Sequence, residues 1–354
     1  MRHFICSCGN TLFFENTTCL QCGLDVGYDP VGARMVALAP QDGVVRCRNG
    51  QDYGACNWLA VGNGEVFCKS CRLNRTVPDL GFPGNRDAWK RVESAKRRVL
   101  YTLFQLGIDP PRWIDDAGRG LAFDILAPVD STPVLTGYAN GVITLNLNEA
   151  DSAERERRRN QLAEPYRTLV GHFRHESAHY VWQQFFGWKA EGDVALQAFR
   201  ELFGDERADY AAALQHYYSY GAPPGWETEF ISGYATAHPH EDWAECWAHY
   251  LHVTDGTETA ADFGLNSKAV PIPFTRFPPE AADLPLGLSL EAGEKKRFME
   301  VLHSWAKLSP ALNEVAASIG QDTLYPFIFS LEVVRKLCFI HWMVLGWKQV
   351  NGTI

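Results

Sequence analysis

Two histidines flank a glutamate in residues 175–179, which read HESAH. On a helix His175 and His179 lie one turn apart on one face, so both imidazoles can bind one metal ion, and neutral imidazole is a good zinc ligand. Glu176 lies about 100° around the axis from His175, where its carboxylate can reach a water on the metal without being a ligand. The spacing predicts a metal-activated water beside a carboxylate base. An amphipathic helix with two incidental histidines is the alternative.

A catalytic zinc needs a third protein ligand and an open position. Eight of the eleven histidines lie between residues 172 and 252, and residues 234–245 read YATAHPHEDWAE. Pro239 is typical of a helix start, and Glu241 and Glu245 then share one helix face. One carboxylate can bind zinc while the other accepts a hydrogen bond from a ligating histidine. Periodicity does not choose between them, and a solvated acidic helix start is the alternative.

An acidic stretch at residues 204–209, GDERAD, is a rival source of ligands. Asp205 and Asp209 would share a face if residues 193–218 form one helix. An exposed helical turn with ion pairs is the alternative interpretation, and the favoured one.

Eight of the ten cysteines precede residue 72 and form two groups of four. Closely spaced pairs let two sulfurs from one tight turn reach one ion, and two such turns complete a tetrahedron. We expect two closed structural zinc sites. Iron in a rubredoxin-like site is the competing metal, and a redox or disulfide role is the other alternative. The two predicted ligand sets are Cys6, Cys8, Cys19 and Cys22, and Cys47, Cys56, Cys68 and Cys71.

These residues need elements to position them. Apolar spacing predicts a helix over about 87–107, and Asn140-Gly141 predicts a hairpin turn between strands,. Pro165 is the expected start of the helix that carries HESAH. The other expected elements are strands 121–126 and 142–147, helices 193–218, 289–318 and 330–346, a helix beginning at Pro239, and a loop over 255–285.

Composition narrows the class of protein. The 354 residues are 46% hydrophobic and 21% charged, which suits a globular protein,. No apolar run is long enough for a membrane span and the start has no leader pattern, so we expect a cytoplasmic protein with no membrane partner. Residues 1–100 hold 13 Lys and Arg against 9 Asp and Glu, and the rest hold 20 against 33. This weak basicity, without interleaved aromatic residues, argues against a nucleic-acid-binding module.

The motifs together resemble a known family. HExxH with a glutamate on a later helix is the gluzincin pattern, and residues 234–245 resemble its lethal-factor-type branch. The whole chain resembles a family of zinc-binding metallopeptidases with an N-terminal zinc ribbon, through CNWL at 56–59, CKSCRLNR at 68–75, HESAHY at 175–180 and EDWAE at 241–245. The resemblance implies that Glu241 is the third ligand, that Glu245 holds a ligand in place, and that Tyr234 stabilises the oxyanion.

The resulting expectation is an α+β chain. Residues 1–75 would form a zinc-ribbon module with two four-cysteine metal sites, 76–86 a linker, and 87–354 a mainly helical zincin-like metallopeptidase domain with a small β-sheet. It would hold one catalytic and two structural zinc ions and cleave a peptide or protein substrate, with Glu176 as general base. The alternative function is a zinc-ribbon adaptor for a protein or nucleic-acid partner on an inactive peptidase scaffold.

Overall fold

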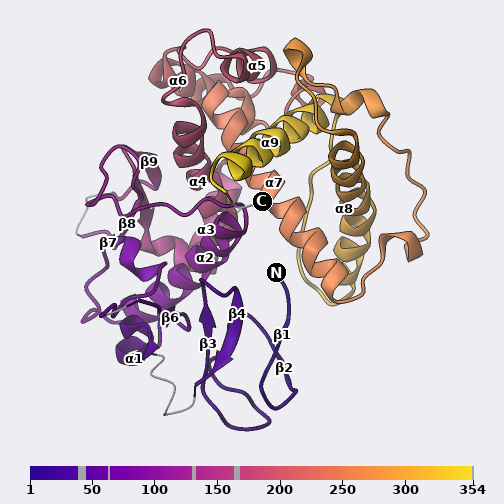
Figure 1. Ribbon diagram of the computed structural model, residues 1–354. Helices are drawn as coiled ribbons and strands as arrows, with labels where there is room; N and C mark the ends of the chain where they lie inside the picture. Colours follow the sequence, from indigo (N-terminus) through magenta and orange to yellow (C-terminus); the bar gives the residue numbers. More distant parts are fainter. Residues whose placement is uncertain (39–44, 63, 130–132, 163–167, 353–354) are drawn as a thin grey trace. The chain divides into compact units, whose positions relative to one another are not determined.

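The computed structural model describes residues 1–38, 45–62, 64–129, 133–162 and 168–352 (Figure 1). Contacts divide the chain into two compact units, Met1–Phe173 and Arg174–Ile354, and the division falls inside helix α4 (Leu169–Phe186). The predicted α+β class, with cysteine clusters before a mainly helical part, is confirmed. The predicted boundaries at residues 75 and 87 stay predictions. Within the described residues, no helix combines the length and the apolar character that crossing a membrane requires.

The described residues of the unit Met1–Phe173 contain short sheets, the α-helices α1, α2 and α3, and two short 3-10 helices. Pairs β1–β2, β3–β4 and β5–β6 are antiparallel, and a four-stranded sheet has the order β7-β8-β10-β9. The bounds are β1 Phe4–Ile5, β2 Thr11–Leu12, β3 Val26–Asp29, β4 Arg34–Ala37, β5 Val45–Arg46, α1 Arg48–Tyr53, β6 Leu59–Ala60, β7 Asn74–Thr76, α2 Asn85–Gln105, β8 Ala122–Leu126, β9 Gly137–Ala139, β10 Val142–Asn146 and α3 Ser152–Leu162.

The predicted hairpin is present. Ala139 pairs with Val142 across a two-residue turn, in which Asn140 and Gly141 both have positive φ, 49° and 81°. Asn-Gly accepts these angles with little strain, so it matches the twist of the flanking strands. Strand β10 also pairs in parallel with β8, which places the hairpin at one edge of the sheet.

Helix α2 shares one aromatic core with the cysteine-rich segment. Phe14, Tyr28 and Trp58 come from that segment, and Tyr101 and Phe104 come from α2. The ring centroids lie 5.2 Å apart for Phe14 and Tyr101 and 6.0 Å apart for Trp58 and Phe104. Aromatic pairs at such separations contribute beyond the area they bury. Phe14 and Trp58 of the cysteine-rich segment therefore share one hydrophobic core with α2.

The unit Arg174–Ile354 is built of helices and short 3-10 turns over its described residues. Helix α7 lies in its interior, with fully buried Trp243 and Trp247, and contacts both α8 and α9 (Figure 1). The bounds are α5 Val194–Phe203, α6 Tyr210–Tyr220, the 3-10 turn η4 Tyr234–Thr236, α7 Pro239–Asp262, α8 Ala292–Ser318 and α9 Leu331–Val350.

Two predictions about these helices are wrong. Residues 193–218 form two helices, because Gly204 (φ 100°) ends α5 and Asp209 caps the start of α6. Residues 255–262 continue α7 instead of starting a loop. Gly256 lies inside this helix, where the Trp305 ring occupies the space that a larger side chain would need. The helix beginning at Pro239 is confirmed, whereas Pro165 lies outside the described residues.

Candidate metal centres

Helices α4 and α7 bring His175, His179 and Glu241 together. One ligand atom from each lies within 4.8 Å of the others. His175 Nε2 is 3.0 Å from one Glu241 oxygen, and His179 Nε2 is 3.7 Å from the other. Both histidines lie on one face of α4 because they are four residues apart. Two nitrogens and one carboxylate oxygen at this separation match a zinc ligand set that leaves a fourth position free.

Indole hydrogen bonds fix the glutamate-bearing helix against the histidine-bearing one. Trp243 Nε1 donates to the Ala178 carbonyl at 3.0 Å, and Trp247 Nε1 donates to Ser177 Oγ at 3.3 Å. Both acceptors lie between the two histidines in sequence. The two tryptophans, one turn apart on α7, therefore set the spacing between Glu241 and the imidazoles.

The first turn of α7 also contacts α9, through the side chain of Lys336. Lys336 Nζ lies 2.6 Å from Asp242 Oδ2 and donates to the Glu229 carbonyl at 2.9 Å. The Asp242 and Lys336 side chains are almost fully buried. Breaking such a buried pair from one side leaves an uncompensated charge, which costs about 3–5 kcal/mol. The pair therefore fixes the position of Asp242, the residue next to Glu241.

Glu245 contacts the edge of the His175 ring that faces away from Glu241. Its Oε1 is 2.8 Å from His175 Nδ1, and its Oε2 accepts a hydrogen bond from Ser232 Oγ at 2.7 Å. Donation from Nδ1 to Glu245 fixes the ring with Nε2 facing Glu241. Of the two glutamates that periodicity could not separate, Glu241 lies within reach of both imidazoles and Glu245 bonds to the opposite edge of one ring.

The protonation states of His175, His179 and Glu241 depend on which positive charge lies between them, a proton or a metal ion. Burial opposes protonation of His175, but hydrogen bonds to Glu241 and Glu245 outweigh it and raise its pKa. Burial lowers the pKa of His179 to about 4, so this imidazole stays neutral at pH 7. Glu241, only 1% exposed, keeps a lowered pKa despite burial because of His175. A metal ion bound to this group would supply the positive charge that a proton on His175 otherwise supplies.

Tyrosines surround this candidate centre, and one of them was not anticipated. Tyr210, the first residue of α6, donates its hydroxyl proton to Glu241 Oε1 at 2.7 Å. Tyr234 lies in η4 with its ring centroid 6.0 Å from that of His175. Partial burial and the nearby charge of Glu241 raise the pKa of both phenols, so both are protonated hydrogen-bond donors at pH 7,. Glu176 is also buried, 5% exposed.

The rival acidic stretch has a different role. Asp205 pairs with Arg207 at 2.8 Å, and Asp209 caps α6 through the backbone N–H of Ala212 at 3.0 Å. The two carboxylates do not share a helix face, because residues 205–209 lie between α5 and α6. The Asp209 cap does matter indirectly, since it starts the helix at Tyr210.

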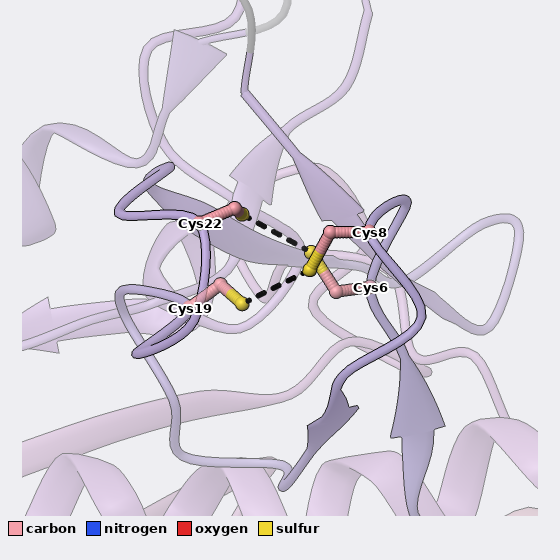
Figure 2. Close-up of side chains that lie close together, drawn as sticks. All are labelled: Cys6, Cys8, Cys19 and Cys22. Carbon is pink, nitrogen blue, oxygen red and sulfur yellow. Dashed lines mark hydrogen bonds between the residues drawn. The ribbon is translucent and has the colours of Figure 1, made fainter.

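The first cysteine cluster is assembled from two tight turns (Figure 2). Sulfur atoms of Cys6 and Cys22 lie 3.8 Å apart, and those of Cys8 and Cys19 lie 3.7 Å apart. Gly9 (φ 89°) closes the first turn by donating its backbone N–H to the Cys6 carbonyl. Backbone donation from Cys22 lowers the pKa of Cys19 to about 6, which favours the thiolate that binds metal,.

The second cysteine cluster is buried and faces α2. Its four sulfurs, from Cys47, Cys56, Cys68 and Cys71, lie within 4.8 Å of one another. Cys71 Sγ is 3.8 Å from Glu93, which pairs with Lys96 at 2.9 Å, and both of these charged side chains are fully buried. Arg97, also buried, donates to the Ala55 carbonyl at 2.6 Å. Four thiolates at this separation fit one tetrahedral ion.

Comparison with known proteins gives two family matches. A family model described as "Putative zinc-binding metallo-peptidase" matches residues 85–343, and a zinc-ribbon domain matches residues 3–82. Uncharacterized proteins of Mycobacterium bovis and of two Mycobacterium tuberculosis strains are 39% identical over 347 residues, covering 97% of this chain and 95% of each relative. No solved structure matches the chain.

Proposed function

Because the chain belongs to the zinc-binding metallopeptidase family matched over residues 85–343, we propose that it hydrolyses peptide bonds at the His175, His179 and Glu241 group. The observation that carries the proposal is the convergence of these three ligand atoms beside a buried Glu176. A helix pair with only a structural role needs neither a carboxylate at position 176 nor one between two imidazoles, because burying an ionised carboxylate costs free energy.

Zinc bound by these three residues would supply a Lewis acid that polarises a water and the substrate carbonyl. Glu176 then accepts the proton of the attacking water and delivers it to the leaving amine. The protonated Tyr234 hydroxyl donates to the developing oxyanion. Glu245 and Ser232 hold the His175 ring in one orientation through both steps.

We propose a structural zinc ion in each cysteine cluster, with iron as the competing metal. The ten cysteines are unpaired, and eight of them form the two four-sulfur groups. Free thiols in this arrangement suit a reducing compartment and support the expected cytoplasmic location.

Replacing Glu176 with Gln tests the reaction. The amide has the same shape but accepts no proton, so we expect normal zinc content and folding with no hydrolysis of a proteome-derived peptide library. The control is Glu201→Gln, on the exposed side of α5, which should behave as wild type. Loss of zinc from Glu176→Gln would contradict the role given to Glu176. A zinc-loaded wild type that cleaves nothing would favour the adaptor function.

A further inference from the structure

Helix α6 has an aromatic sequence but no buried residue. It reads YAAALQHYYSY over Tyr210–Tyr220, and all eleven residues are described. The exposed fraction is 63% for Tyr218 and 78% for Tyr220. Exposed aromatic clusters on a soluble protein commonly mark a surface that binds something.

One face of α6 leads away from the candidate zinc ligands. Four residues spaced by three, four and three positions follow one stripe of the helix,. They are Tyr210, Ala213, Tyr217 and Tyr220. Tyr210 bonds to Glu241 at one end of the stripe. Two turns further, the Tyr217 ring lies 5.5 Å from the ring of Tyr234. The stripe therefore begins at a candidate ligand and passes the candidate oxyanion donor.

A pocket of about 490 Å³ opens on the same stripe. Helix α6 contributes Ala213, His216, Tyr217 and Tyr220, and the other walls are residues 221–224 and 236–237. Its volume is in the range of ordinary ligand sites, which is about 300–1,000 Å³. The described lining contains aromatic rings and two prolines but no Asp, Glu, Lys or Arg.

We propose that this pocket, the α6 pocket, binds an aromatic side chain of the peptide substrate. The inference rests on the proposed peptidase function. Aromatic rings pack favourably edge-to-face against Tyr217 and Tyr220, whereas a charged side chain would meet no Asp, Glu, Lys or Arg of opposite charge in the lining,. At about 1.5 Å per residue, Tyr217 is about 10 Å along α6 from Tyr210. An extended peptide covers that distance in about three residues, so the aromatic residue lies within about three or four positions of the cleaved bond.

The test measures peptide recognition separately from hydrolysis. The full-length, zinc-loaded Glu176→Gln protein captures peptides from a random synthetic library. Ala213→Phe in this background fills the α6 pocket with a ring. Ala211→Phe is the matched control, because Ala211 is an exposed alanine on the opposite face of α6 and is not among the pocket residues. Wild-type protein is assayed in parallel for the sequences it cleaves.

We expect captured peptides to carry Phe, Tyr or Trp at one fixed position, with about tenfold tighter binding than their alanine counterparts. Ala213→Phe should abolish this difference, and Ala211→Phe should keep it. If Ala213→Phe does not fold, as judged by its melting temperature, Tyr220→Ala replaces it, because removal of a 78% exposed side chain leaves the helix intact.

The outcomes separate the two proposals. Capture without an aromatic preference overturns the pocket, as does an equal preference in the Ala213→Phe and Ala211→Phe proteins. Wild-type cleavage that ignores aromatic residues also overturns it and leaves the peptidase function standing. A preference for aromatic peptides that Ala213→Phe abolishes supports the pocket. If the wild-type protein at the same time cleaves no peptide, the pocket stands and the peptidase function fails.

Discussion

Removing Glu241 or Glu245 should weaken zinc binding to different degrees, because only Glu241 lies within reach of both imidazoles. Glu245→Ala deletes the acceptor for His175 Nδ1 at 2.8 Å and for Ser232 Oγ at 2.7 Å. Loss of such an outer partner typically costs 10–100-fold in affinity, or about 1.4–2.7 kcal/mol. Glu241→Ala removes a proposed ligand together with its charge, so its loss should exceed about 100-fold.

The assay is a chelator titration of the purified zinc-loaded protein. The ion bound by two imidazoles and one carboxylate should be released first, and the two ions in the cysteine clusters serve as an internal standard, because four thiolates hold zinc more tightly. His179→Ala sets the scale for the loss of a ligand. Glu314→Ala, an exposed glutamate on α8, is the control for a general effect of removing a carboxylate.

One result would refute the assignment. If Glu245→Ala matches His179→Ala while Glu241→Ala keeps near-normal affinity, the ligand is Glu245. The relation between Tyr234 and a ligand seven residues later would then lose its support.

Three further predictions concern the metal content, the two tyrosines of the candidate site and a buried histidine. Elemental analysis of protein purified without chelator should find about three zinc ions per chain, and one or none would contradict the cysteine sites. Tyr210→Phe should weaken zinc binding by about tenfold, whereas Tyr234→Phe should keep zinc and lower kcat by about 100-fold or more; the reverse pattern in a zinc titration and a rate assay would exchange their roles. Burial lowers the pKa of His341 to about 4, so the folded chain leaves it neutral while the unfolded chain protonates it below about pH 6.5, and stability falls as pH falls between these values,. Urea unfolding at pH 7 and pH 5 should therefore show that His341→Gln loses about 1–2 kcal/mol less than wild type over this interval, and equal losses would contradict the assignment.

Local patterns in the sequence were sufficient for the elements that carry the candidate ligands. The HESAH spacing, Pro239 and the Asn140-Gly141 turn each act over a few residues, and the structure has a helix or a turn at each of these places. The extent of α7 was not predictable in this way, because Gly256 disfavours a helix locally. The reason for a glycine there is a tertiary contact, since a larger side chain would clash with the Trp305 ring.

Long-range partners of the site could not be read from spacing. Tyr210 bonds to Glu241 at the start of α6, a helix separate from α5. The prediction of one continuous helix over 193–218 therefore gave no reason to expect this contact. The signal was Asp209 before an alanine-rich run, which is typical of a helix cap. Lys336 is 94 residues from Asp242, and nothing in either local pattern pairs them. Which charges meet across a core depends on packing, since buried pairs have no period in sequence.

Because we propose that the second cysteine cluster holds zinc, we expect the stability of the core around it to depend on the bound metal,. A zinc ion bound to these four thiolates would leave two net negative charges, which the buried Arg97 on α2 would partly neutralise,. Without the metal the thiols are protonated, and Arg97 loses these negative neighbours, although Glu15 still pairs with it at 3.3 Å,. This change lies inside a core that α2 shares with the cysteine-rich segment. We expect metal-free chains to open there and be degraded, so that the abundance of the protein follows the availability of the metal.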